Sequence, residues 1–433
     1  MEKQIQLSYF DEFTDTSTNL KTLRSGTFVD NMTQPLHRWF RFSAGFSAEW
    51  VEQLLGHWNV TPEQFVLDPF AGSGTVSLTC DKLGLRSIGI EAHPTIARIF
   101  RAKLHWTSSV EQFVDLAERI LNDASNHKKN FFDYPALINR SFDPETLVQL
   151  DALRISWRLH DDHSPASELV WLAITAILRS CSRAGTAQWQ YILPNKTKKK
   201  VLQPSIAFRQ QVQMMAMDMR WMQSRRKYSW TDIVVGDARD CDKLIKEKVD
   251  FVITSPPYAN NYDYADALRF EMSFWGEING WGDLHDKVRK HLIVSSSQHS
   301  SKEKLILDDL LSASVIAPIR SDLTDVVNKL AAIRGDHGGK KHYHTMIAAY
   351  CQDIGFVLRS LRKVCRPSVQ MCWVIGDSAP YGVYCPIDEW IGQLAVAEGF
   401  TSYSFDKLRD RNIKWKNRKH RVPLKEGFLW IEG

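Results

Sequence analysis

The chain has 433 residues, of which 44% are hydrophobic and 24% charged, as is typical of a globular protein with one large domain or two to three smaller ones. No apolar run approaches the ~20 residues of a membrane span, and the first residues lack a secretory signal, so we expect a cytoplasmic protein without a membrane partner. The net charge is +5, and the cysteines lack metal-ligand spacing, which predicts reduced, mostly buried thiols and no metal.

Residues 1–34 are polar and weakly patterned, and we interpret them as a leader. The aromatic-rich segment 35–47 follows and ends at Ser47, which is suited to cap a helix. Apolar residues at helical spacing predict that helix: Trp50, Val51, Leu54 and Leu55. Such a segment is equally compatible with ordinary core.

A short apolar strand at 65–67 runs into a glycine-rich turn, and helical spacing resumes after it. Strand, glycine turn and helix form the first unit of a Rossmann-like fold. Gly72 and Gly74 permit a tight turn and close approach of the backbone to a ligand. Asp68 at the strand end would repel a bare phosphate, and Ser77 replaces the third glycine of pyrophosphate-binding turns. We therefore expect a nucleoside-like ligand with a positive group.

The next strand, 87–90, ends in Glu91. An acidic residue there, roughly 20 residues beyond the glycine turn, is placed to bind both ribose hydroxyls. The alternative is a carboxylate at a helix N-terminus, which Pro94 disfavours by following so closely. With Asp68, Glu91 predicts a nucleoside cofactor site.

From residue 95 to 230 the alternation of strand and helix lapses, and helical patterns predict an inserted helical region. The methionine-rich stretch 214–222 is better explained as core filling than as a binding groove. A basic loop includes Lys196 to Lys200, so we expect one surface of the insertion to face a polyanion.

The α/β pattern resumes with a strand at 232–235, and Asp237 after it is placed to accept from an adenine amine. Another buried strand, 249–253, stops at Thr254-Ser255-Pro256-Pro257-Tyr258. This turn offers a hydroxyl and an aromatic ring at the carboxyl edge of the sheet, which suits a flat heterocycle that carries an amino group. The alternative is an ordinary surface turn.

Residues 277–345 are polar and form a second insertion or a long loop. From residue 346 a helix, a strand at 369–377, another helix and a basic tail lead to a last strand at 428–431.

Basic residues gather in four clusters, the densest of which runs from Lys407 to Arg421. One such cluster could be a solvated face, but four together favour a nucleic-acid partner. The candidate phosphate contacts are Lys196, Lys198, Lys199, Lys200, Arg411, Lys414, Lys416, Arg418 and Lys419.

The glycine turn at 68–75 and the turn at 254–258 together resemble the paired signatures of DNA amino-methyltransferases that use S-adenosylmethionine. Segment 37–47 resembles the N-terminal cofactor-binding motif of that family, and Ser255 resembles the first residue of the catalytic motif in its N4-cytosine branch. The resemblance implies a Rossmann-like class I methyltransferase fold, in the α/β class, with a mostly parallel twisted sheet flanked by helices.

The catalytic domain would comprise residues 35–94, 231–276 and 346–433. The two inserted regions, 95–230 and 277–345, are then the candidates for DNA binding and target recognition.

The resemblance assigns the cofactor site to residues of both turns and of the neighbouring strand ends: Phe46, Ser47, Asp68, Pro69, Phe70, Gly72, Ser73, Gly74, Thr75, Glu91, Asp237, Ala238 and Thr254. The catalytic residues would be Ser255, Pro256, Pro257 and Tyr258. The Ser255 hydroxyl and the Pro256 carbonyl would accept the protons of the target amine, and Tyr258 would stack on a base flipped out of the duplex.

The implied function is methylation of cytosine N4 in DNA, within restriction-modification or a related defence system that has a cognate endonuclease or other component. Adenine N6 and RNA or tRNA amino groups are the alternative targets. A dehydrogenase or a non-catalytic DNA-binding module fits the two turns less well. The chain has no Pro-Cys dipeptide, which argues against C5-cytosine methylation.

Overall fold

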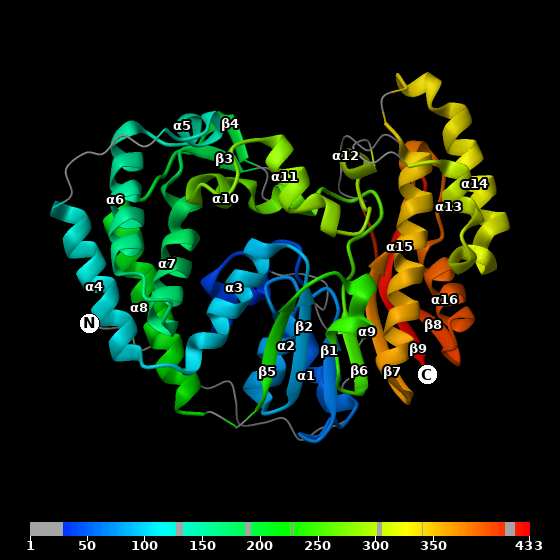
Figure 1. The fold of residues 1–433 in the computed structure, drawn as a ribbon, viewed down its shortest axis with the longest axis horizontal. Coiled ribbons are helices and arrows are strands. Elements are labelled where there is room, and N and C mark those ends of the chain that lie inside the picture. The colour runs from blue at the N-terminus through cyan, green and yellow to red at the C-terminus, as the bar shows by residue number, and fades with distance from the viewer. Residues whose placement is uncertain are drawn as a thin grey trace.

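We describe the protein from a computed structural model, in which residues 29–126, 133–186, 192–225, 227, 229–300, 305–339, 341–411 and 421–433 are placed. In these ranges a seven-stranded sheet has the order β5-β2-β1-β6-β7-β9-β8 (Figure 1). Its strands are β1 (Phe65–Asp68), β2 (Arg86–Glu91), β5 (Thr231–Val235), β6 (Val249–Thr254), β7 (Cys365–Gly376), β8 (Ser402–Asp410) and β9 (Lys425–Glu432).

The first five strands of that order run parallel, and β9 is antiparallel to both of its neighbours. The predicted α/β fold with a mostly parallel sheet is confirmed. The connection order reverses between β1 and β6, because β1 leads outward to β2 and β5 while β6 leads to β7. Ligands bind at such a switch point, beyond the carboxyl ends of the strands.

Helices cover both faces of the sheet, which explains why its central strands β1 and β6 are mostly apolar. On one face, α1 (Ala48–His57) and α2 (Thr75–Leu83) pack against strand residues such as Val66 and Ile253. On the other face, α15 (Tyr343–Val364) and α16 (Ile387–Ala397) pack against residues such as Leu67 and Val252.

The crossover from β2 to β5 contains α3 (Pro94–Leu104) and then a helical block, at the left of Figure 1. Its helices are α4 (Val110–Asn126), α5 (Ala136–Ser141), α6 (Pro144–His160), α7 (Pro165–Cys181) and α8 (Pro204–Gln223). β3 (Ala184–Thr186) and β4 (Ile192–Thr197) pair antiparallel beside α5. Met215, Met219 and Met222 are buried in the core of the block, which confirms the prediction of core filling for them, but Met217 of the same stretch is 64% exposed.

The core of the block also includes Trp39 from the aromatic segment and Trp275 from α10 (Arg269–Trp275). The block therefore shares its core with segments on both sides of it in the sequence. The boundaries of the inserted regions stay a prediction.

The described residues between 277 and 345 are largely helical, with α11 (Trp281–Lys287), α12 (Ser297–Ser300), α13 (Leu307–Ser312) and α14 (Arg320–Ile333). α13 and α14 pack against α15 and extend the core on that face of the sheet.

The seven cysteines all lie in the described ranges and are buried free thiols, as predicted. No helix in those ranges has both the length and the apolar character that a membrane span requires.

Candidate cofactor and substrate site

A cavity of about 750 Å³, measured with its open mouth, lies at the carboxyl ends of β1, β2, β5 and β6. Its volume is in the range of small-molecule sites. It is lined by eleven of the residues predicted for the cofactor or for catalysis: Phe46, Pro69, Phe70, Gly72, Ser73, Thr75, Glu91, Asp237, Ala238, Ser255 and Pro257. The structure thus brings the two turns, which are far apart in the sequence, to one cavity.

The other six residues predicted for the cofactor or for catalysis do not line the cavity. Ser47 caps α1 by accepting from the backbone N–H of Trp50. Gly74 has φ +91°, and an added Cβ would lie 2.4 Å from the Phe100 ring, so only glycine fits there. The remaining residues of this group are Asp68, Thr254, Pro256 and Tyr258. Their roles at the site stay predictions.

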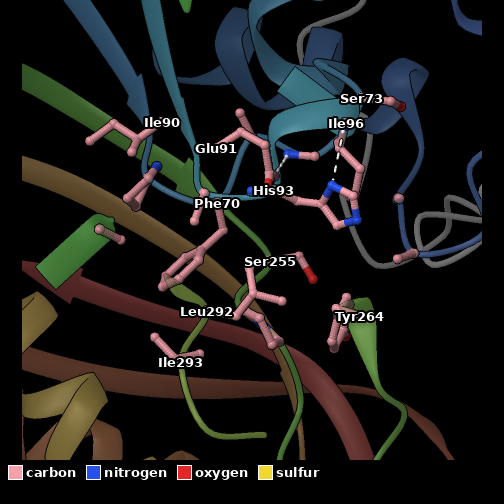
Figure 2. A pocket seen from close by; sticks show the side chains of 18 of the residues that line it. Phe70, Ser73, Ile90, Glu91, His93, Ile96, Ser255, Tyr264, Leu292 and Ile293 are labelled. Carbon is pink, nitrogen blue, oxygen red and sulfur yellow. Dashed lines mark hydrogen bonds between the residues drawn. The ribbon is translucent and has the colours of Figure 1, made fainter. Parts of the chain in front are cut away.

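Two buried carboxyl groups organise the glycine turn. Oδ1 of Asp68 accepts from the Thr254 hydroxyl at 2.6 Å and from the backbone N–H of Phe70 at 3.0 Å. The Glu91 carboxylate accepts from the backbone N–H groups of Gly72 and His93, both at 2.8 Å. Asp68 therefore ties β1 to β6 behind the turn, while Glu91 faces the cavity from β2 (Figure 2).

Burial raises the pKa of Asp68 to about 7, and the nearby Glu91 charge acts in the same direction. Burial also raises the pKa of Glu91 to about 7, against the backbone hydrogen bonds that lower it. Both groups consequently change charge near neutral pH. The pKa of each carboxyl is higher in the folded than in the unfolded state. The protonated carboxyls therefore favour the folded state of the free protein at low pH, and this contribution to stability is lost as the pH rises through about 7.

We expect affinity for the predicted cofactor to have the opposite pH dependence. Ribose hydroxyls donate to a carboxylate, so binding favours ionised Glu91, and Kd should fall about tenfold between pH 6 and 8. Isothermal titration calorimetry in two buffers of different ionisation enthalpy would also detect the released proton.

Glu91→Gln should bind the cofactor more weakly and lose most of this pH dependence. Glu118→Gln, an exposed change on α4, is the matched control and should behave as the unaltered protein does. An affinity that is equal at pH 6 and pH 8 would contradict the assignment of Glu91.

Asp237 lines the cavity, but its carboxylate is already paired. It accepts from Nε of Arg239 at 2.9 and 3.0 Å and from the backbone N–H of the same residue at 2.9 Å. Arg239 also donates to Asp353 at 2.7 Å. An adenine amine would thus share an oxygen of Asp237 with an arginine.

Phe42, Ala44 and Gly45 also line the cavity and belong to segment 37–47, which resembles the cofactor-binding motif. Other lining residues have no counterpart in the prediction, among them Ile90, Ala92, His93, Ile96, Tyr264, His291, Leu292 and Ile293. His93 caps α3, since its Nδ1 accepts from the N–H of Ile96 at 3.4 Å, and burial lowers its pKa to about 4. The ring is therefore neutral at pH 7. Pro94, a residue favoured at the first position of a helix, is the signal that could have marked His93 as the cap.

The second turn leaves β6 with the Ser255 side chain at the cavity (Figure 2). Tyr258 is half-buried, and its backbone N–H donates to the Tyr264 hydroxyl at 3.3 Å. Burial raises the pKa of the Tyr258 phenol well above its usual value, so the ring is uncharged. The turn therefore presents a hydroxyl and a neutral ring beside the cofactor cavity.

The predicted phosphate contacts differ in exposure. Lys196, Lys199 and Lys200 are exposed, whereas Lys198 donates to the carbonyl of Arg179 at 2.7 Å. The side chain of Arg411 is only 10% exposed. The other four, Lys414, Lys416, Arg418 and Lys419, lie outside the described residues.

Comparison with known proteins gives matches in sequence. A family model described as DNA methylase matches residues 13–102. Type II methyltransferase M.BsoBI of Geobacillus stearothermophilus is 24% identical, over 99% of this chain and 91% of its own length. Type II methyltransferase M.AvaI of Nostoc sp. is 26% identical, over 86% and 81%. A comparison of structures matches an rRNA methyltransferase of Streptomyces viridochromogenes over 92% of this chain and 84% of its own, at 10% identity and a TM-score of 0.25.

Proposed function

We propose that this S-adenosylmethionine-dependent DNA methyltransferase transfers the methyl group to the exocyclic N4 of a flipped-out cytosine. The resemblance to the DNA amino-methyltransferases is confirmed by the DNA methylase model and the two Type II relatives, and S-adenosylmethionine is the methyl donor. Those relatives also support a restriction-modification context. We further propose a cognate restriction endonuclease or other defence component as a partner.

The observation that carries the proposal is the shared cavity. Ser255 from the end of β6 and Glu91 from the end of β2 line the same space, with the glycine turn of β1 between these strands. A cofactor held by the glycine turn would therefore lie against the Ser-Pro-Pro-Tyr turn, where a target amine can reach it.

The residues present fit the cofactor. Glycine at position 72 allows the turn to pack against Phe42, another lining residue, because an added Cβ would lie 2.9 Å from the Phe42 ring. Glu91 is an acceptor for ribose hydroxyls, and Phe46, Phe70 and Ile293 supply apolar walls for a nucleoside. Bound there, S-adenosylmethionine would supply a methyl group on a sulfonium, whose carbon a nucleophile can attack in line as the thioether of S-adenosylhomocysteine leaves.

The protein's part in the chemistry is to orient the amine. A cytosine amino nitrogen is a poor nucleophile, because its lone pair is delocalised into the ring. The Ser255 hydroxyl oxygen and the Pro256 carbonyl would accept hydrogen bonds from its two N–H groups and localise the lone pair toward the methyl group, and the methylated nitrogen would then lose one proton. Tyr258 would hold the base by stacking. Serine at the first position of this turn favours cytosine over adenine.

Product analysis tests the proposal. DNA methylated by the purified protein with isotope-labelled cofactor would be digested to nucleosides and separated by mass spectrometry. Label in N4-methyl-2′-deoxycytidine supports the proposal, whereas label in N6-methyl-2′-deoxyadenosine would assign the adenine alternative. Label only in an RNA substrate supplied in parallel would overturn the DNA assignment.

The DNA surface is proposed to include the loop after β4. Lys198 in this loop donates to the carbonyl of Arg179, whose guanidinium pairs with Glu271 and donates to the carbonyl of Ala267 at 2.9 Å. Glu271 lies on α10, which follows the catalytic turn, and β3, β4 and α10 lie near one another in Figure 1. The exposed lysines are thereby anchored on the substrate side.

Changing Lys196, Lys199 and Lys200 together to Gln should weaken DNA binding and reduce its salt dependence. Each lost phosphate contact lowers the slope of log Kobs against log salt by about 1. A control triple with the same charge change lies before the start of β6. Its members are the exposed residues Lys243, Lys246 and Lys248. Fluorescence anisotropy with a DNA duplex measures the affinity and its salt slope for both triple variants. Equal salt slopes for the two triples would contradict a role of the loop in DNA binding.

A further inference from the structure

Arg411 immediately follows β8 and lies against the catalytic turn. Its guanidinium carbon is 5.0 Å from the centroid of the Tyr258 ring, a cation–π distance. The side chain is 10% exposed. An arginine that contacts phosphates needs its donors at the surface, and these donors are directed inward.

Three groups from different parts of the fold fix the guanidinium. Nη1 donates to the carbonyl of Asp377, just beyond β7, at 2.5 Å. Nη2 donates to Oδ1 of Asn261, three residues past Tyr258, at 3.4 Å. Nε lies 3.9 Å from the Glu426 carboxylate on β9. The guanidinium therefore connects the catalytic turn to the end of β7 and to β9.

The end of β7 also leaves space for this side chain. A Cβ added at Gly376 would lie 2.7 Å from Nη1 and 2.9 Å from Cδ of Arg411. The glycine is thus explained by close approach of the arginine.

Tyr258 is held from other directions as well. Its backbone carbonyl accepts from the N–H of Asn261 at 3.2 Å, and its own N–H donates to the Tyr264 hydroxyl. The Ser255 side chain also acts on the phenol and lowers its pKa, against the larger effect of burial. With Arg411 on one face, a base could stack only on the opposite face of the ring.

We infer that Arg411 is a positioning residue that covers one face of Tyr258, so that the target base stacks on the opposite face, next to Ser255. This inference rests on the proposed function. It also replaces the predicted role of Arg411 as a phosphate contact. The cation would act on turnover by fixing the ring, and would leave cofactor and backbone-phosphate binding unaffected.

The test compares Arg411→Ala, Arg411→Lys and Gly376→Ala with the unaltered protein on one DNA substrate. We expect kcat to fall about tenfold in Arg411→Ala, with cofactor Kd and the salt slope of DNA binding unchanged. Arg411→Lys should recover part of the loss. Millimolar guanidinium should raise the activity of Arg411→Ala and of none of the other proteins compared. Gly376→Ala should displace the arginine and reproduce the loss, which provides a second test if Arg411→Ala fails to fold.

Arg409→Ala is the matched control. Arg409 lies on β8, two residues before Arg411, and pairs with the same Glu426 at 2.9 Å. Its side chain, however, is 41% exposed. It should retain the kcat of the unaltered protein. A reduced salt slope with normal kcat in Arg411→Ala would show that Arg411 contacts phosphate. That result would overturn this inference and leave the proposed function intact. An unaltered protein that methylates no DNA base would overturn the proposed function, and the inference with it.

Discussion

Ser255→Ala is expected to lower kcat for methyl transfer by about 10²- to 10³-fold, the usual effect of removing one preorganised hydrogen-bonding group from a reacting centre. The Ser255 side chain is at the cavity, whereas the neighbouring Thr254 hydroxyl is used in the bond to Asp68. Loss of the Ser255 hydroxyl therefore removes an acceptor without disturbing the bond between β1 and β6. Steady-state kinetics with saturating DNA and cofactor measures the change.

Cofactor binding should survive in this variant, with Kd within about twofold of the original. Ser73→Ala makes the same chemical change on the glycine turn of the same cavity and is expected to raise the cofactor KM with little effect on kcat. If the two variants showed the same kinetic defect, Ser255 would belong to the cofactor site and not to the reacting centre.

Asp263→Ala is expected to lower the free energy of unfolding by about 3–5 kcal/mol, because it leaves Arg289 buried without its carboxylate. Both side chains are at most 4% exposed, and Asp263 also caps a short helix by accepting from the N–H of Ala265 at 3.2 Å. Arg289 precedes His291 to Ile293, which line the cavity, so cofactor affinity should fall as well. Urea denaturation followed by fluorescence measures the stability.

An exposed ion pair offers a control for this loss. Asp143 and Arg183 are 2.7 Å apart with 53% and 43% exposure, so Asp143→Ala should cost less than about 1 kcal/mol. The double variant Asp263→Ala, Arg289→Met should regain much of the stability, since no unpaired charge stays buried. A double variant less stable than Asp263→Ala would show that packing, and not the charge, sets the cost.

The parts of the site that were predictable from the sequence are those that local chemistry determines. Gly72, Glu91 and Ser255 each occupy a strand end or a turn whose neighbours constrain it, and all three line one cavity. Which base the Ser255 turn accepts is a question of chemistry that the fold leaves open, and it stays a proposal.

The wall at His291 to Ile293 could not be predicted, because these residues reach the cavity only through the packing of residues 277–345 on α15. β8 was missed for another reason. It is an edge strand with no fully buried residue, so its charged sequence lacks the apolar alternation of a strand. Contact between Arg411 and Tyr258 likewise depends on a pairing of β8 with β9 that no local pattern encodes.

The position of the helical block between β2 and β5 has a consequence for how the protein folds. The two strands pair in register from Ser87 with Thr231 to Glu91 with Val235. With ~140 residues between them, closing this loop costs only about 1.4 kcal/mol more than closing one of ~30 residues, because the entropy grows with the logarithm of length. The rate is another matter, since pairings that distant in sequence form slowly. We expect β2 to present an unpaired edge during synthesis until the block and β5 have emerged, which makes that edge the point at which nascent chains are most prone to associate.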